Sequence, residues 1–212
     1  DDLGGEVLGL LQADSTGNQL TLLRSEFVGA NVGEELRDQG GMALLLALAV
    51  VMIYVAARFQ FKFSVGAVMS LFHDVIIIIG MFALFQWEFD LTVMAALLAV
   101  IGYSLNDTIV VDDRIRENFR ILREGDSTYI INESLTQTLD RTLMTSATTA
   151  LVVLALMLFG GDMIHNFSVA MMIGLVVGTY SSIYISANIL LAMNISREDL
   201  MPPELEEIDD RP

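Results

Sequence analysis

Residues 97–120 read LLAVIGYSLNDTIVVDDRIRENFR, and they contain the clearest structural signal in the sequence. It begins as an uninterrupted apolar helical pattern, places Asn106 beside Asp107, returns to apolar residues, and becomes charged from Asp112 onward. The pattern predicts a membrane-spanning helix in which Asp107 lies about one turn inside the hydrocarbon. A charge near the bilayer centre costs roughly 2.5–3.5 kcal/mol on insertion scales, so acids in membrane spans are rare and functional by default. Asp107 is therefore the first candidate for a functional residue.

The composition is that of a membrane protein. Apolar residues make up 54% of the 212 residues, and the mean hydropathy is +0.59, which is too high for a soluble domain. The formal net charge of −16 excludes nucleic acid as an expected partner, because little positive charge is available to neutralise phosphates. With no cysteine and two histidines, neither a disulfide nor a structural zinc site is expected. The sequence also contains no phosphate-binding loop, HExxH motif or Ser/His/Asp arrangement, so we expect no enzymatic activity.

Five apolar stretches, each near the ~20 residues that a bilayer requires, predict five membrane spans and an all-α polytopic bundle. Residues 1–38 before them are water-soluble in character, with one strand predicted at 19–28 and a short polar helix at 33–38. Residues 194–212 after them form an acidic tail. The five predicted spans are residues 41–57, 63–87, 91–111, 142–161 and 167–193.

The basic residues predict the orientation of these spans. Arg and Lys occur between the first and second spans, between the third and fourth, and after the fifth, whereas loops 86–90 and 162–166 contain neither. The positive-inside rule places the basic connections in the cytoplasm, so residues 1–38 lie outside and the C-terminus lies inside. The long cytoplasmic connection at 113–141 carries two amphipathic helical patterns separated at Gly125. We expect these two helices to lie along the membrane surface.

Three interpretations of Asp107 remain open at this point. It is a structural acid hydrogen-bonded to a neighbouring helix, a ligand of a bound cation, or a group that relays an ion or a proton. Tyr103, Ser104 and Asn106 place further polar groups within about one turn of it, as a supporting polar shell, and they favour the last two interpretations. No set of residues has the pattern of a metal-ligand cluster, and no protein-bound metal is predicted.

Arg141 is the predicted partner of Asp107, because it lies where the fourth span enters the membrane from the same side. A run of hydroxyl residues that includes Thr145 follows it, and such runs face neighbouring helices or a hydrated cavity more often than lipid. Arg141 alone fits a snorkelling anchor at the interface equally well. Taken together with Asp107, it predicts an ion-relay pair.

Three other features of the spans carry predictions. Asp74, inside the second span, fits a buried relay group and a plain helix–helix hydrogen bond equally well. Gly174 and Gly178 form a GxxxG motif, which predicts close helix packing. Asp112 and Asp113, at the cytoplasmic end of the third span, are expected at the interface.

The motif IGYSLNDTIVV at 101–111, followed by DRIREN at 113–118, resembles the SecD/SecF family of protein-export membrane proteins in the RND superfamily. The likeness extends to EFVG at 26–29, to HD at 73–74 and to SLTQTL at 134–139. It implies an RND-type bundle of six transmembrane helices with a small α+β periplasmic domain, P1, between the first two.

The resemblance also implies an assignment for parts of this chain. The five spans correspond to helices two to six of the family, and residues 1–38 to the C-terminal remnant of P1. The acid and the arginine that the family uses in proton transport fall on Asp107 and Arg141. Family members often carry Phe or Ser at the position of Asp112, so the acid found here departs from the pattern.

The function implied by the resemblance is that of an auxiliary subunit of the Sec protein-translocation machinery in the bacterial inner membrane. Such a subunit uses H+ or Na+ flow down the proton-motive or sodium-motive gradient to drive late steps of secretion, without a bound cofactor. The expected partners are SecD, the SecYEG translocon with YajC and YidC, unfolded preprotein and membrane lipid. Two alternatives stay open: a non-conducting scaffold for SecD or the translocon, and a small-molecule exporter of the RND superfamily.

Overall fold

The structure is a computed structural model, and it describes residues 3–14, 30–58, 60–122 and 124–200. Two compact units are distinguished, residues 1–39 and residues 40–212. The described part of the first unit is helical and consists of α1 (Leu3–Asp14) and the beginning of α2. The strand predicted at 19–28 lies outside the described residues, as does the acidic tail from residue 201 onward.

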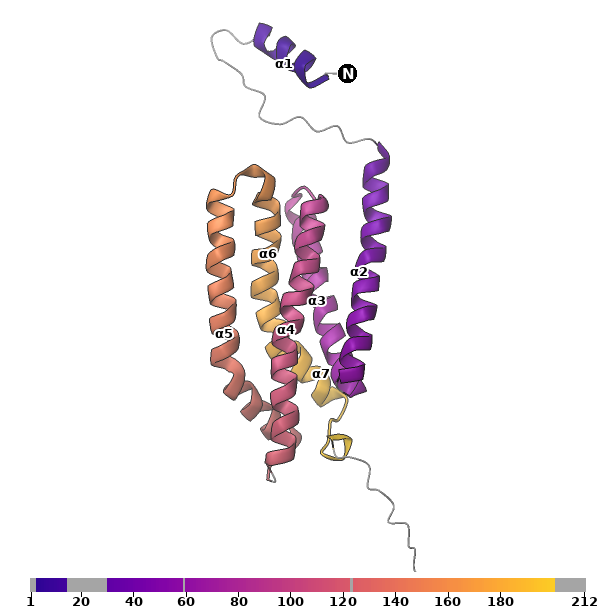
Figure 1. Cartoon of the computed structure of the whole chain (residues 1–212), viewed down its shortest axis with the longest axis vertical. Coiled ribbons are helices and arrows are strands. Elements are labelled where there is room, and N and C mark those ends of the chain that lie inside the picture. The colour runs from indigo at the N-terminus through magenta and orange to yellow at the C-terminus, as the bar shows by residue number, and fades with distance from the viewer. Residues whose placement is uncertain (1–2, 15–29, 59, 123, 201–212) are drawn as a thin grey trace, which may run out of the picture. The chain divides into compact units, whose positions relative to one another are not determined.

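The second unit is a bundle of long apolar helices that run up and down side by side (Figure 1). Within the described residues, five helices are long and apolar enough to cross a membrane, which confirms the predicted number of spans. The last of them begins as an α-helix, passes through one π-helical turn, η1, and continues as α7. The long elements are α2 (Ala30–Arg58), α3 (Phe61–Phe85), α4 (Leu91–Ile121), α5 (Ser127–Phe159), α6 (Asp162–Tyr180), η1 (Ser181–Ile185) and α7 (Ser186–Ala192).

Polar residues at the turns set the helix ends. The Asp90 carboxylate accepts a hydrogen bond from the Val93 N–H at 2.9 Å and caps the beginning of α4, and Asp126 caps α5 in the same way through the Tyr129 N–H. α3 ends at Phe85, and the next residue, Gln86, has a φ of 57° in the left-handed region common at helix C-termini. The apolar helices therefore stop where a polar side chain or a left-handed residue satisfies the free backbone groups.

The connection between α4 and α5 differs from the predicted pair of surface helices. α4 continues without a break through Asp113 to Ile121, and α5 begins at Ser127, so both amphipathic segments are extensions of the spans. The predicted break at Gly125 is present, and its φ of 99° lies in the region that favours glycine. The prediction of separate interfacial helices is therefore wrong.

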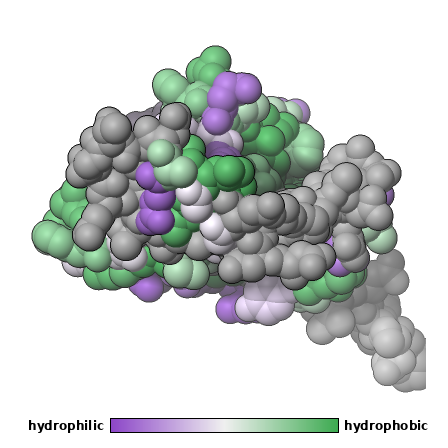
Figure 2. Space-filling view, turned by 90° about the horizontal axis from the view of Figure 1, so that it is seen from above, coloured by the Kyte–Doolittle hydropathy of each residue, from purple (hydrophilic) through white to green (hydrophobic). Residues whose placement is uncertain are grey.

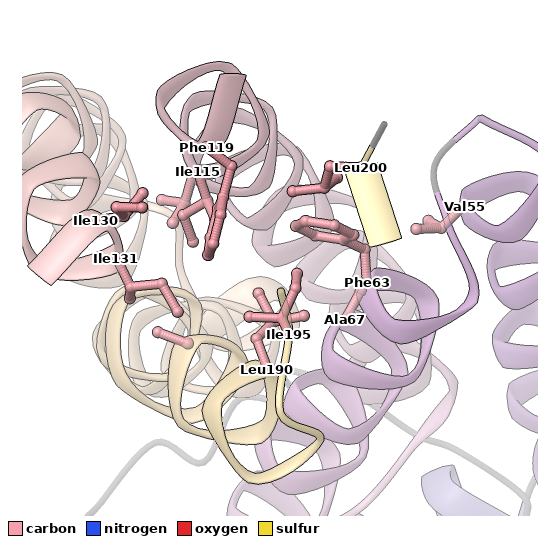
Figure 3. Close-up of a cluster of buried hydrophobic side chains, with 12 residues drawn as sticks. Val55, Phe63, Ala67, Ile115, Phe119, Ile130, Ile131, Leu190, Ile195 and Leu200 are labelled. Carbon is pink, nitrogen blue, oxygen red and sulfur yellow. The ribbon is translucent and has the colours of Figure 1, made fainter. Parts of the chain in front are cut away.

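A cluster of buried apolar side chains gives the physical reason (Figure 3). Ile115 and Phe119 of α4 pack with Ile130 at the beginning of α5, and Phe63 of α3 and Leu190 of α7 complete the cluster. Each of these side chains is at most 4% exposed, and full burial of such a side chain stabilises by about 1.5–3 kcal/mol. The apolar faces of the two segments are thus covered by other helices of the bundle.

The outer surface of the bundle is largely apolar. Leu46, Ile76, Leu151 and Val176 are each more than half exposed, and they come from four different helices. Apolar residues also line the periphery of the described part of the molecule when it is seen from above (Figure 2). Apolar surface of this extent is unusual in water, and a lipid environment accounts for it.

A short segment after α7 ties one end of the bundle together. Lys62, at the start of α3, donates hydrogen bonds to the Asp199 carboxylate at 2.6 Å and to the Asn194 carbonyl at 3.2 Å. Ser127, at the start of α5, donates to the Ile195 carbonyl at 2.7 Å. The hydrogen bond from Lys62 holds the pKa of Asp199 below its ordinary value, because it stabilises the carboxylate.

Two glycines allow α6 to pack closely on α4. A methyl group added at Gly174 would overlap with the Val100 side chain, and one added at Gly178 would lie 3.2 Å from Ser104 Cβ. Val100 and Ser104 are one turn apart on α4, so the two glycines form a continuous contact along that helix. This contact holds Ser104 in place for the site described below.

We predict that Gly174→Ala lowers the free energy of unfolding by about 1–3 kcal/mol, because the added methyl group overpacks the contact with Val100. The measurement is reversible unfolding of the purified protein in bicelles. Gly102→Ala is the matched control, since a methyl group at Gly102 meets no atom within 4 Å. Val100→Ala should restore stability to the Gly174→Ala variant, and equal losses in the Gly174 and Gly102 variants would contradict this description of the contact.

Candidate functional site

Asp74 lies at the centre of a hydrogen-bonded node that joins three helical segments. Its Oδ2 atom accepts hydrogen bonds from Ser104 of α4 at 2.7 Å and from Ser181 of η1 at 2.8 Å. Its Oδ1 atom lies 3.1 Å from Nδ1 of His73. The Asp74 side chain is 1% exposed, and a buried carboxyl group is tolerated when several donors satisfy it. These contacts are the helix–helix hydrogen bonds that the structural interpretation of Asp74 predicts.

The π-helical turn places one serine at this node and a second serine about two turns further along α4. Within η1 the N–H of Ser186 bonds to the carbonyl of Ser181, five residues earlier, so the helix is locally widened. Ser181 thereby reaches Asp74, and Ser186 reaches Asp112. Such turns are rare in α-helices and occur frequently at functional sites.

Asp107 lies elsewhere on α4, and the groups around it come from α5. It is 4% exposed, and the groups that interact with its carboxyl are the hydroxyls of Ser146 and Thr145 and the guanidinium of Arg141. Among the described residues, Asp107 Oδ2 has no hydrogen-bond partner, and Arg141 acts on it from beyond the 4.0 Å of a contact ion pair. The Asp107 carboxyl is thus buried without a full set of hydrogen-bond donors, in contrast to the Asp74 carboxyl.

A line of buried hydroxyls on α5, here called the hydroxyl stripe, adjoins Asp107. The stripe consists of Ser134, Thr138, Thr142 and Ser146, which are four residues apart and therefore share one helix face. At one end the Asn118 amide of α4 donates to Ser134 Oγ at 2.9 Å. At the other end the Tyr103 hydroxyl donates to Ser146 Oγ at 3.3 Å, and Ser146 Oγ lies 2.6 Å from Thr179 Oγ1 of α6. The stripe follows the α4–α5 contact from Asn118 to the surroundings of Asp107.

The structure brings together most, but not all, of the residues that the sequence nominates. Tyr103 and Thr145 lie near Asp107, whereas Ser104 is turned toward Asp74. Asn106 is exposed and makes no polar contact in the part of the chain that the structure describes, so its place in the polar shell stays a prediction. Within the same residues no group of three His, Cys, Asp or Glu side chains is placed to hold a metal ion.

Asp112 is the residue that sequence reasoning misplaced. It is 1% exposed, and Ser186 Oγ lies 3.5 Å from its Oδ1 atom, whereas Asp113 is exposed. The signal was present in the spacing, because Ser104, Thr108 and Asp112 repeat every four residues and therefore share one face of α4. This face of α4 is buried, and it packs against η1.

Residues 11–196 match the family model described as protein export membrane protein SecD/SecF, C-terminal. The chain belongs to the SecD/SecF family. The Protein translocase subunit SecF of Pseudomonas aeruginosa is 53% identical over 212 residues, which cover 100% of this chain and 69% of that protein. The subunit SecF of Vibrio alginolyticus is 51% identical over 216 residues, covering 100% of this chain and 68% of that protein.

Longer relatives of the SecD/SecF family contain the same bundle. The Protein translocase subunit SecDF of Thermus thermophilus is 46% identical over 178 residues, covering 84% of this chain and 24% of that protein. The crystal structure of SecDF, described as a translocon-associated membrane protein from that organism, matches with a TM-score of 0.83 at 43% identity. It covers 92% of this chain and 27% of the longer one. The chain thus spans about two thirds of the SecF relatives and about a quarter of SecDF.

We predict that Ser104→Ala and Ser181→Ala each lower the free energy of unfolding by about 1–3 kcal/mol, because each leaves the buried Asp74 carboxyl short of a donor. Unfolding in bicelles measures the effect. Thr148→Ala is the control, since that exposed hydroxyl bonds only to the backbone of its own helix. If both serine variants behaved like the Thr148 variant, the node would not be a structural contact.

Proposed function

We propose that this chain forms most of the membrane bundle of an auxiliary subunit of the Sec protein-export machinery, and that ion flow through Asp107 drives late steps of export. The observation that carries the proposal is the enclosed Asp107 carboxyl, which faces the hydroxyl stripe and Arg141 without being saturated by either. An acid in this setting binds a cation or proton and releases it at low cost, unlike one that is locked by several donors. The coupling ion in this proposal is H+ or Na+, and no cofactor takes part.

The proposed ion-transport cycle has two states, which differ in how Arg141 and the hydroxyls of α5 interact with Asp107. When Asp107 carries a proton or a cation, the charge that attracts the guanidinium is neutralised. When the ion leaves, the carboxylate attracts Arg141 and accepts hydrogen bonds from Thr145 and Ser146. Because the two side chains interact without a contact ion pair among the described residues, α4 and α5 have room to approach when the charge returns.

The free energy available to such a cycle is sufficient for a conformational change. Movement of one elementary charge through 100 mV releases about 2.3 kcal/mol. A shift of this size changes a two-state equilibrium by roughly fiftyfold, since 1.4 kcal/mol is a factor of ten. We infer that this free energy biases a movement of the extramembrane domain that holds an emerging preprotein.

The partners belong to the proposal as well. SecD is inferred as a partner, because a relative named SecDF carries this bundle as about a quarter of one longer chain. The SecYEG translocon, YajC, YidC and unfolded preprotein follow from the role proposed for the family. Membrane lipid would cover the apolar outer surface of the bundle.

We also propose a location in the bacterial inner membrane with the C-terminus in the cytoplasm, following the distribution of Arg and Lys in the loops. The chain has no cysteine, so single cysteines report accessibility without background. We predict that cysteines at Glu88 and Asp162 react with a membrane-impermeant thiol reagent in intact cells, and that one at Glu124 reacts only after permeabilisation. All three residues are exposed, and labelling of Glu124 in intact cells would reverse the orientation.

The ion-relay role is tested by neutralising the two partners. We predict that Asp107→Asn and Arg141→Gln each reduce gradient-driven preprotein translocation in membrane vesicles to the level measured without a gradient, while the protein remains inserted. Asp113→Asn is the matched control, because this exposed acid lies on the same helix and leaves the enclosed carboxyl unchanged.

The double variant Asp107→Asn with Arg141→Gln separates relay from scaffold. A scaffold needs only that no unpaired charge is buried, so the double variant of a scaffold would recover activity. A relay needs a group that binds the ion, so its double variant stays inactive. Recovery of gradient-driven translocation in the double variant would therefore contradict the proposed function.

A further inference from the structure

Asp112 is a buried acid whose carboxyl is stabilised by almost no hydrogen-bond donor or opposite charge in the described bundle. Its side chain is 1% exposed, and its Oδ2 atom has no hydrogen-bond partner among the described residues. The one polar contact of its carboxyl is the long one with Ser186, at 3.5 Å. Val111 and Ile115 on α4 and Leu190 on α7, which are buried at this level of the bundle, are apolar. An ionised carboxylate in such surroundings costs several kcal/mol even after relaxation of the protein.

No charged side chain in the described part of the chain compensates the Asp112 carboxyl. The elements η1 and α7 contain no Asp, Glu, Lys, Arg or His. Lys62 of α3 bonds to Asp199, and Glu133 of α5 bonds to Gln137. Among the described residues, Ser186 is the only group that acts on the Asp112 carboxyl. The charged residues on the elements packed around this part of α4 are Lys62, Asp113, Arg116, Glu133, Arg197, Glu198 and Asp199.

Close helix packing keeps water and larger ions out. A methyl group added at Gly66 of α3 would lie 3.2 Å from Ser186 Oγ and 3.4 Å from the Ser186 carbonyl oxygen, so α3 and α7 are nearly in backbone contact here. A hard cation such as Ca2+ takes six or more oxygen ligands, and one carboxyl with one hydroxyl does not approach that number. The ligand that fits this space is a proton.

We propose that Asp112 and Ser186 form a second proton-binding site in this bundle, and that release of its proton loosens the packing of α7 on α4. The site is separate from Asp107, because five residues turn an α-helix by about 500°, or 140° beyond one full turn. Asp107 faces α5, whereas Asp112 faces α7. The inference goes beyond the proposed ion relay and does not depend on it.

The π-helical turn explains how loosening would occur at this point. η1 immediately precedes Ser186, and a π-helical turn interrupts the regular hydrogen-bond pattern of the helix. When Asp112 ionises, the charge requires water, and water reaches it only if Ser186 and the following turn move away from α4. The turn at η1 lets α7 shift while α6 remains held on α4 by Gly174 and Gly178.

Infrared spectroscopy of the intact protein in lipid bilayers tests the first part. We expect the carbonyl band of a protonated carboxylic acid at neutral pH that Asp112→Asn removes and Asp113→Asn keeps. Ser186→Ala keeps the acid but loses its hydrogen bond, so the same band should shift to higher frequency. The serine variant also decides the question if the Asp112→Asn protein does not fold. Absence of an acid band that responds to either variant would overturn the site.

Hydrogen exchange tests the second part of the proposal, namely that proton release from Asp112 loosens the packing of α7 on α4. Opening that releases one proton should become up to about tenfold more frequent per pH unit, after correction for the intrinsic pH dependence of exchange. We therefore expect the amides of Ser181–Ala192 to lose protection as pH rises in the wild-type protein and in Asp113→Asn, and to keep it in Asp112→Asn. The same loss in Asp112→Asn, or protection independent of pH in the wild type, would overturn the proposed coupling.

Discussion

An ionised carboxyl group inside a helix bundle must find hydrogen-bond donors or a counter-charge there, because hydrocarbon and packed apolar side chains provide neither. Three acids in this chain meet that constraint in three ways. Asp74 has two serine donors and a histidine. Asp107 has hydroxyls and a guanidinium nearby, and its Oδ2 atom has no hydrogen-bond partner among the described residues. Asp112 has one distant hydroxyl. The acids thus differ in compensation, from three polar partners at Asp74 to a single long contact at Asp112.

Helix packing determines which hydrogen-bond donors and opposite charges reach each buried acid. Gly178 leaves room for Ser104 to reach Asp74, and a methyl group there would lie 3.6 Å from the Asp74 carboxyl. Gly66 allows α7 to close over Asp112 in a comparable way. Close backbone approach is the usual means by which membrane helices associate, because lipid removes the hydrophobic driving force between them. In this bundle the same small residues also position the polar groups.

The SecD/SecF family relationship and the local chemistry support the same function by different routes. The family model covers residues 11–196 and therefore both Asp107 and Arg141. The structure adds the hydroxyl stripe, whose members are one turn apart on α5. The stripe runs beside α4 from Asn118 to Tyr103. A polar line in an otherwise apolar contact is costly to maintain, and the ion flow proposed above would give it a use.

Hydropathy, charge and turn residues act locally, so they predict the five spans, the place of Asp107 in the third, that of Arg141 at the start of the fourth, and the break at Gly125. Which acids find hydrogen-bond donors depends on the packed bundle. Whether Asp74 meets Ser181, whether Asn106 faces inward, and whether Asp112 is buried depend on the rotation and register of one helix against another. Those are set by packing across the bundle, including a π-helical turn, and the apolar pattern of a single helix does not specify them. The predicted surface helices failed for the same reason: an amphipathic face fits a membrane surface and a neighbouring helix equally well, and here it packs against helices.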